Sequence, residues 1–332
     1  MNSSSVKYVH FGVAGVLLDA LARGRRTIYI TDGNLLRSWG GFFEGKEVLL
    51  MGIGEQHKGV GEYQRLCCEL LRMGADRATL LVGVGGGIVS DMTGFLGTTF
   101  MRGMPFGFIP TTLLGQIDAA IGGKNGVNVG GYKNILGTFS TPEFVIVDGG
   151  FLSTLPEGEH RAAWGELLKY ELLMGKELAG DESSVRSCVE YKLRIVEQDL
   201  RDRGVRHILN LGHTFAHAVE ALTEGRIAHG QAVALGLVLM GRMSVALGLL
   251  DSAVADRIEH RVRVRGLLSE LPEGVSGADM VRVMWGDKKR VGGQLRMVFL
   301  QGIGDAVVRG VSGAELERGL LKTDLYDFGM RF

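Results

Sequence analysis

The sequence predicts an α/β N-terminal domain with a largely parallel sheet, followed by a mostly α-helical C-terminal domain. The chain has 332 residues, enough for two domains of ordinary size. In its first half, short apolar runs alternate with amphipathic stretches, which is typical of βαβ units. After about Pro156, helical periodicity prevails. We therefore place the two domains at residues 1–152 and 153–332.

Five apolar runs in the first half predict buried strands. They lie at residues 27–32, 47–51, 79–84, 106–110 and 144–148. Continuously apolar strands are typical of a parallel sheet that is covered on both faces. The amphipathic stretch GEYQRLCCELLRMG, residues 61–74, predicts a helix between two of these strands.

The second half contains four stretches with helical periodicity, at residues 157–175, 183–200, 207–225 and 232–250. Only QLRMVFL, residues 294–300, predicts a strand there. The run 232–250 is apolar enough to suggest a membrane span. However, Arg242 lies within it, and His229 and Gln231 lie at its start. We therefore expect a buried core helix.

Composition narrows the class of partner. Lys+Arg and Asp+Glu number 37 each, so no global field favours nucleic acid or a membrane surface. A local basic cluster would then indicate an anionic small molecule. The three cysteines are an odd number, which favours a reducing compartment over a disulfide framework. The N-terminus carries no secretory pattern, and we expect a cytoplasmic protein.

A glycine run follows the third predicted strand. Gly85, Gly86 and Gly87 lie between this strand and a helix expected to begin near Ser90. Such glycines let backbone amides approach a phosphate at a helix N-terminus. The G-x-G-x-x-G fingerprint is absent, and a tight turn explains the run equally well. Asp91 could cap the helix or reach a ribose hydroxyl.

A second glycine-rich stretch, residues 118–134, contains Asp118, Lys124, Lys133 and Asn134. It has too much glycine for a regular helix, so we expect the lysines to lie on loops. Lysines beside backbone amides suit an anionic or polyhydroxylated ligand. The alternative is a solvated loop, which the apolar segments on either side of the stretch disfavour.

Three of the eight histidines lie between residues 210 and 230. His213 and His217 are four residues apart and would share one helix face, and His229 begins the next helical stretch. Glu166 lies in an apolar helical stretch, with Lys169 on the same face. Two histidines and a glutamate leave a catalytic zinc ion one open position. The spacing alone does not decide whether His213 or His217 is the ligand.

Eight segments of the sequence resemble the 3-dehydroquinate synthase family. They occur in the family's order between about Asp32 and Leu300. They are GVGGGIVSDMTGF, FMRG, PTTLLGQIDAAIGGKNGVN, GYKNILGTF, GELLKY, LNLGHTFAHAVE, AHGQAVALG and DKK.

The resemblance implies a Rossmann-like NAD-binding domain and a helical domain that binds a divalent metal ion, zinc or cobalt. It puts the metal ligands at Glu166, His213 and His229, and makes His217 an acid–base residue. It also implies a homodimer.

The resemblance further assigns residues to the substrate and to NAD. The catalytic residues would be His217, Lys124, Lys169 and Asp202. Substrate contacts would come from Arg102, Asp118, Lys124, Asn134, Lys169, Lys192, Arg206, Asn210, His217, Lys288 and Lys289. NAD contacts would come from Asp32, Asn34, Glu55, Lys58, Gly86, Gly87, Asp91, Thr111, Thr112, Lys133 and Thr154.

The implied reaction is a phosphate-eliminating carbon–oxygen lyase step of the shikimate pathway, which leads to chorismate and the aromatic amino acids. It would convert 3-deoxy-D-arabino-heptulosonate 7-phosphate to 3-dehydroquinate and phosphate. The implied sequence is transient oxidation by NAD, elimination of phosphate, re-reduction, ring opening and intramolecular aldol closure.

Three positions depart from the family pattern. Ser90 replaces a common glycine, Gln231 replaces a common glutamate beside His229, and Asp202 replaces a common glutamate. The alternatives are another sugar phosphate cyclase, an NAD- and metal-dependent polyol dehydrogenase, and an inactive metal-binding paralogue. Intact metal-ligand and lysine positions disfavour the last of these.

Overall fold

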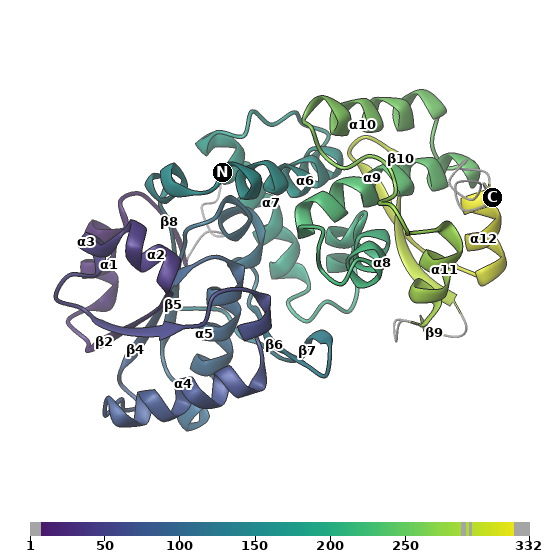
Figure 1. Ribbon diagram of the computed structural model, residues 1–332. Coiled ribbons are helices and arrows are strands. Elements are labelled where there is room, and N and C mark those ends of the chain that lie inside the picture. Colours follow the sequence, from purple (N-terminus) through teal and green to yellow (C-terminus); the bar gives the residue numbers. More distant parts are fainter. Residues whose placement is uncertain (1–7, 287–289, 292–293, 322–332) are drawn as a thin grey trace. The chain divides into compact units, whose positions relative to one another are not determined.

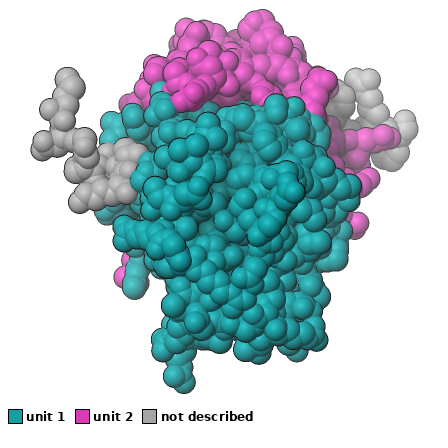
Figure 2. Space-filling model, turned by 90° about the vertical axis from the view of Figure 1, so that its left-hand side faces the viewer, with its two compact units in different colours: residues 1–156, 185–201 teal, residues 157–184, 202–332 magenta. Residues whose placement is uncertain are grey.

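A computed structural model of the protein describes residues 8–286, 290–291 and 294–321. The chain divides into two compact units, which we treat separately (Figure 2). Unit 1 comprises residues 1–156 and 185–201, and unit 2 comprises residues 157–184 and 202–332. Most of helix α7 (Glu182–Gln198) therefore belongs to unit 1, although it follows the first helix of unit 2 in the sequence.

Unit 1 is built on a six-stranded sheet with the order β1-β8-β5-β4-β2-β3, in which every pair is parallel (Figure 1). The strands are β1 (Val9–Phe11), β2 (Thr27–Asp32), β3 (Glu47–Met51), β4 (Leu80–Gly85), β5 (Phe106–Pro110) and β8 (Phe144–Val147). All five expected strands are present, and β1 is an addition. Its three residues are too few to form a recognisable apolar run.

Helices cover both faces of this sheet, as its apolar strands require. One face forms a core with α1 (Ala14–Ala22), α3 (Gly40–Phe43) and η4 (Gly149–Thr154), through residues such as Leu18, Val82 and Phe151. On β4 the side chains alternate, and Gly83 faces Thr93 of α5 (Gly87–Thr99). The helix α4 (Val60–Arg72) packs against β3, and the short helices α2 (Gly33–Ser38) and η1 (Glu55–His57) follow β2 and β3.

The glycine-rich stretch after β5 is more regular than expected. A short π-helical turn, η3 (Gly115–Ala119), leads into the antiparallel hairpin β6 (Lys124–Val129) and β7 (Tyr132–Phe139). The expectation that Lys124 and Lys133 lie on loops is therefore wrong. Gly126 and Gly137 face each other across the hairpin, where a Cβ atom at either would lie within 3 Å of the opposite backbone. The glycines that argued against a helix thus permit close strand pairing.

Unit 2 is arranged around the buried helix α9 (His229–Ala246), which packs against α6 (Glu157–Met174), α8 (His213–Leu222) and α10 (Ser252–Val264) (Figure 1). Arg242 of α9 forms an ion pair with Glu259 of α10 at 2.6 Å, which explains a charge within an apolar helix. Among the described residues, no helix is long and apolar enough to cross a membrane.

The prediction of a single strand in the second half is wrong. Strands β9 (Arg290–Val291), β10 (Gln294–Gly302) and β11 (Asp305–Val311) form an antiparallel sheet. Helices α11 (Gly277–Gly286) and α12 (Gly313–Leu321) lie before and after this sheet in the sequence. Strand β11 is only half-buried and contains a glycine, so its apolar signal is weak.

Candidate active site

Three side chains of unit 2 converge on one point. Glu166 comes from α6, His213 is the first residue of α8, and His229 is the first residue of α9. The Nε2 atoms of both histidines lie 3.1 Å from Oε1 of Glu166. One potential ligand atom from each residue lies within 4.8 Å of the other two. Among the described residues, this is the group of three or more His, Cys, Asp or Glu side chains that could hold a metal ion.

A glycine adjoins each of these three residues and permits the convergence. A Cβ atom at Gly165 would lie 1.9 Å from the Gly230 carbonyl oxygen, so α6 and α9 cross with their backbones in contact. A Cβ atom at Gly236 would lie 2.2 Å from the Gly212 carbonyl oxygen, where α8 begins against α9. Larger residues would separate these helices and the side chains they carry.

Gly212 has a second role. It adopts a left-handed φ of 76°, which favours glycine, and it separates η5 (Val205–Asn210) from α8. The single helical stretch expected over residues 207–225 is therefore interrupted. As a result, His213 stands at the start of a helix rather than in its middle.

The carboxylate of Glu166 is ionised in a buried setting. Burial opposes its charge, but Lys169, His213 and His229 outweigh burial and hold the pKa of Glu166 well below its usual range. Lys169 Nζ lies 2.5 Å from Oε2, so the pair leaves Oε1 to the two imidazoles. For His229, burial lowers the pKa, but Glu166 and Glu220 raise it to about 10.

The donor set fits a divalent metal ion. Nδ1 of His213 lies 3.1 Å from the Leu211 carbonyl oxygen, an acceptor, so this nitrogen carries the proton. Nε2 is then the nitrogen that can bind an ion, and it lies 3.1 Å from Oε1 of Glu166. Two imidazole nitrogens and one carboxylate oxygen match a three-ligand site with an open position.

His217 lies one turn after His213 on α8 and is exposed. The centroids of the two rings are 5.7 Å apart. His217 is therefore a neighbour of the three-residue group without being a member of it. This position suits a residue that exchanges protons with a ligand bound beside the group.

The remaining sequence-predicted residues of unit 2 lie on and around η5. Arg206 is buried and Asn210 is partly buried. Oδ1 of Asp202 lies 3.1 Å from Nδ1 of His207, whose Nε2 lies 3.4 Å from Arg296. Lys288 and Lys289 lie outside the described residues.

In unit 1 the residues predicted to contact NAD follow the carboxyl ends of parallel strands. Asp32 ends β2, Gly86 and Gly87 follow β4, and Thr111 and Thr112 follow β5. The carboxyl ends of parallel strands share one edge of a sheet, where α/β proteins bind ligands. The strand that follows β2 in the sequence lies on one side of β2, whereas β4 and β5 lie on the other side, so the gap between β2 and β4 is the topological switch point of this sheet.

Helix α5 begins at Gly87 rather than near Ser90. A Cβ atom at Gly86 would lie 3.1 Å from Cγ2 of Thr112, so the turns after β4 and β5 lie close together. Asp91, which is partly buried, forms an ion pair with the buried side chain of Lys58. Burial raises the pKa of Asp91 more strongly than Lys58 lowers it.

Other predicted NAD residues already have protein partners. The Asp32 carboxylate caps α2 by accepting from the amides of Asn34 and Leu35. Glu55 accepts from Asn128 at 2.8 Å, and Thr154 accepts from Trp39 at 2.7 Å. Lys133 lies on β7 and is exposed.

The substrate residues predicted in unit 1 are only partly brought together. Lys192 of α7 donates to the Asp118 carbonyl oxygen at 2.6 Å, and its Nζ lies 3.1 Å from Oδ1 of the same residue. Lys124 starts β6, while Asn134 lies on β7. Arg102 ends the short helix η2 (Phe100–Arg102) and is exposed.

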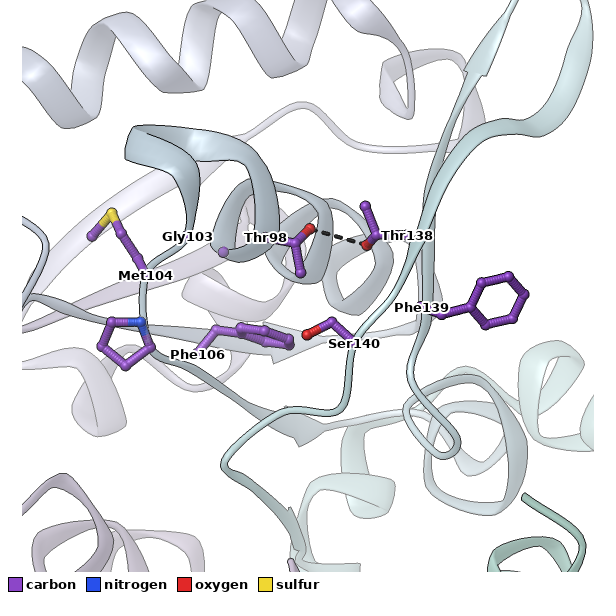
Figure 3. A pocket seen from close by; sticks show the side chains of 9 residues that line it. Thr98, Gly103, Met104, Phe106, Thr138, Phe139 and Ser140 are labelled. Atoms are coloured by element: carbon purple, nitrogen blue, oxygen red, sulfur yellow. Dashed lines mark hydrogen bonds between the residues drawn. The ribbon is translucent and has the colours of Figure 1, made fainter. Parts of the chain in front are cut away.

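A pocket in unit 1 is lined by none of these residues, although it adjoins two of them (Figure 3). Gly103 follows Arg102, and Phe139 pairs with Lys124 in the hairpin. It is lined by Gly97, Thr98, Gly103, Met104, Pro105, Phe106, Thr138, Phe139 and Ser140. The hydroxyls of Thr98 and Thr138 bond to each other at 3.0 Å. No titratable side chain lines the pocket, so it offers no acid, base or metal ligand.

Sequence reasoning missed two features of the metal-ligand group. Glu220 lies behind His229, and the glycines at positions 165, 212 and 230 permit the helix contacts. Residues 213, 217 and 220 are spaced by four and three, so the shared face of Glu220 could have been noticed. Nothing local to the sequence marks the glycines as helix contacts.

Comparison with known proteins gives consistent matches. The model of the 3-dehydroquinate synthase N-terminal region matches residues 48–162, and that of the C-terminal region matches residues 159–290. A 3-dehydroquinate synthase from Teredinibacter turnerae is 40% identical over 286 residues, covering 81% of this chain and 79% of the relative. A 3-dehydroquinate synthase from Thermococcus kodakarensis is 41% identical over 277 residues, covering 81% and 80%.

Among solved structures, a 2-epi-5-epi-valiolone synthase from Streptomyces hygroscopicus with NAD⁺ and Zn²⁺ bound has a TM-score of 0.85. It is 26% identical in sequence, and the match covers 95% of this chain and 96% of the other.

Proposed function

The chain belongs to the 3-dehydroquinate synthase family, and we propose that it converts 3-deoxy-D-arabino-heptulosonate 7-phosphate to 3-dehydroquinate and phosphate. The observation that carries this proposal is the convergence of Glu166, His213 and His229 within a chain of this family. We further propose that residues 1–152 bind NAD and that residues 153–332 bind the metal ion. The protein would act in the cytoplasm, in keeping with its free cysteines.

Glu166, His213 and His229 would hold a divalent metal ion, zinc or cobalt. When bound, the ion supplies Lewis acidity toward a substrate oxygen, and NAD supplies a hydride acceptor that is regenerated in each cycle. Lys169 balances the charge of Glu166 and keeps this buried carboxylate ionised. The Leu211 carbonyl holds the proton of His213 on Nδ1 and directs Nε2 toward the ion.

Proton transfer would fall to His217, assisted by Lys124, Lys169 and Asp202. An imidazole is a side chain that can accept and release protons near neutral pH. The exposed ring of His217 lies within 5.7 Å of the His213 ring, measured between centroids. Asp202 is held through His207, which fixes the direction of its carboxylate.

The substrate carries a phosphate and a carboxylate, and both need cations. Part of this charge would come from Arg102, Lys124, Lys169, Lys192 and Arg206. Lys288 and Lys289 would add to it. Polar contacts to hydroxyls would come from Asp118, Asn134 and Asn210.

NAD would bind at the carboxyl edge of the parallel sheet in unit 1. The backbone amides of Gly86 and Gly87 lie at the N-terminus of α5, where they would donate hydrogen bonds to the pyrophosphate. Asp32, which ends β2 at the switch point, and Asp91, on α5 after β4, would face the ribose. The other contacts would come from Asn34, Glu55, Lys58, Thr111, Thr112, Lys133 and Thr154.

We also propose a homodimer. The hairpin β6–β7 exposes several large apolar side chains, with Tyr132 at 64% and Ile135 at 49% exposure. A group of exposed apolar side chains of this size is typical of a surface that is buried against another protein chain. Light scattering should give twice the mass of one chain, and Ile135→Asp should lower it. Val16→Asp, at an exposed position of α1, is the matched control.

A phosphate-release assay with the heptulosonate phosphate and NAD below the substrate concentration tests the function. We expect many phosphates released per NAD, a carbocyclic product and no accumulation of NADH. Accumulating NADH would indicate a polyol dehydrogenase, and turnover only with another sugar phosphate would indicate a different cyclase. His213→Ala should abolish release, whereas His260→Ala, at an exposed position of α10, should not change it.

A further inference from the structure

Glu220 is a buried carboxylate directed at the metal-ligand group. It lies in the last turn of α8 and is only 7% exposed. Its Oε2 lies 3.5 Å from Nδ1 of His229, the imidazole nitrogen on the side away from Glu166. A buried carboxylate needs a partner, and the imidazole provides one.

The ring of His229 is thereby held from both sides. Nε2 faces Oε1 of Glu166 at 3.1 Å, and Nδ1 faces Oε2 of Glu220. A histidine that binds an ion does so as a neutral imidazole with one proton, and a carboxylate at Nδ1 retains that proton there. Nε2 is then left as the nitrogen that can bind an ion.

The two histidine ligands are oriented by different groups. His213 uses the Leu211 carbonyl oxygen, a backbone acceptor fixed by the turn that precedes α8. His229 is the first residue of its helix, and its acceptor comes from a neighbouring helix through a side chain. His229 therefore depends on one substitutable residue, whereas His213 does not.

The nearest side chain of α9 does not take this role. Gln231 lies two residues after His229, and its Oε1 accepts from the Leu268 amide at 2.7 Å. That hydrogen bond ties α9 to the segment after α10. The amide of Gln231 is therefore committed to holding a loop.

We propose that Glu220 is a positioning residue of the metal site, which accepts the Nδ1 proton of His229 and so presents Nε2 to the ion. This inference rests on the metal site of the proposed function. A carboxylate behind a histidine ligand raises the basicity of that ligand and fixes its ring. Glu220 also lies two turns after His213 on the same helix face, so α8 supplies both a ligand and the support for another ligand.

The test is a zinc-affinity measurement by competition with a chromophoric chelator. Glu220→Ala should weaken zinc binding by about 10- to 100-fold. Glu220→Gln should weaken it less, because the amide oxygen still accepts the Nδ1 proton but carries no charge. Glu224→Gln, an exposed substitution of the same kind two residues beyond α8, should leave the affinity unchanged.

Unfolding of the chelator-treated proteins separates positioning from folding. We expect Glu220→Gln to unfold at the same urea concentration as the wild type and still to bind zinc more weakly, and it remains informative if Glu220→Ala does not fold. If Glu220→Gln and every folded Glu220→Ala sample bind zinc as tightly as the wild type, the role of Glu220 is overturned while the metal site stands. Failure of the wild type itself to bind zinc would overturn the metal site and this proposal with it.

Discussion

Gly165→Ala should destroy the metal site without touching any ligand. A Cβ atom at this position would lie 1.9 Å from the carbonyl oxygen of Gly230 and 2.7 Å from its carbonyl carbon. Close carbon–oxygen contacts in proteins are at about 3.3 Å or more. The backbones of α6 and α9 must therefore separate by about 1.4 Å at their crossing.

That separation is large for a metal site. Ligand distances in such sites hold to about 0.2 Å, and Glu166 moves with α6 while His229 moves with α9. We expect zinc affinity to fall by more than about 100-fold, beyond the loss from removing a supporting residue. Gly165→Ala should also lower the free energy of unfolding. Overpacking a core costs about 1–3 kcal/mol, and we expect the upper end of this range because the added Cβ meets backbone atoms rather than a flexible side chain.

The assay combines chelator competition with urea unfolding of the metal-free protein. Gly158→Ala is the matched control, because it lies on the same helix with no atom within 4 Å of the added Cβ. Alanine there should leave zinc affinity unchanged and raise stability by up to about 1 kcal/mol. One zinc ion per chain at wild-type affinity in Gly165→Ala would refute the helix-crossing explanation.

Three further predictions address single side chains. His213→Ala should lose the metal in elemental analysis, while His217→Ala should keep it and lose about 10²- to 10⁴-fold in kcat; metal loss in both would contradict the separate roles. Asp91→Asn should lower the unfolding free energy by about 3 kcal/mol in urea, because its lysine partner stays buried. Asp256→Asn, at an exposed position of α10, is the control. Arg65 and the backbone amide of Gly52 donate hydrogen bonds to the Glu62 carboxylate and hold its pKa below the ordinary 4.5. The stability that the ionised carboxylate contributes is therefore present above pH 4.5 and is lost on acidification. Glu62→Gln should lose less stability than the wild type as the pH falls below 4.5, and an equal loss would exclude this contribution.

Strands in the middle of the sheet could be predicted from sequence because their burial is continuous. The predicted ranges 27–32 and 106–110 coincide with the inner strands β2 and β5. The range 47–51 coincides with β3, an edge strand that is only partly buried. Parallel strands covered on both faces are apolar along their whole length, and this pattern is local. The hairpin β6–β7 carries no such pattern, because its glycines serve close strand pairing and most of β7 is exposed.

For the candidate site, the sequence predicted which residues could take part but not how their side chains lie relative to one another. Spacing brought His213 and His217 to one helix face and left the choice of ligand open, and the choice came from family resemblance. The break at Gly212, which puts His213 first in α8, is visible only in the folded backbone. The support from Glu220 is also a contact between two helices.

The sequence by itself determined the apolar strands of the parallel sheet, most of the helical stretches and which residue types are available for chemistry. These properties depend on neighbours a few residues apart, through periods of about 3.6 and 2 residues. Only the tertiary structure decided that Glu166 and His229, 63 residues apart, meet at 3.1 Å. That distance depends on how closely α6 and α9 approach, and the approach is set by the absence of a side chain at Gly165 and Gly230, which no local pattern encodes.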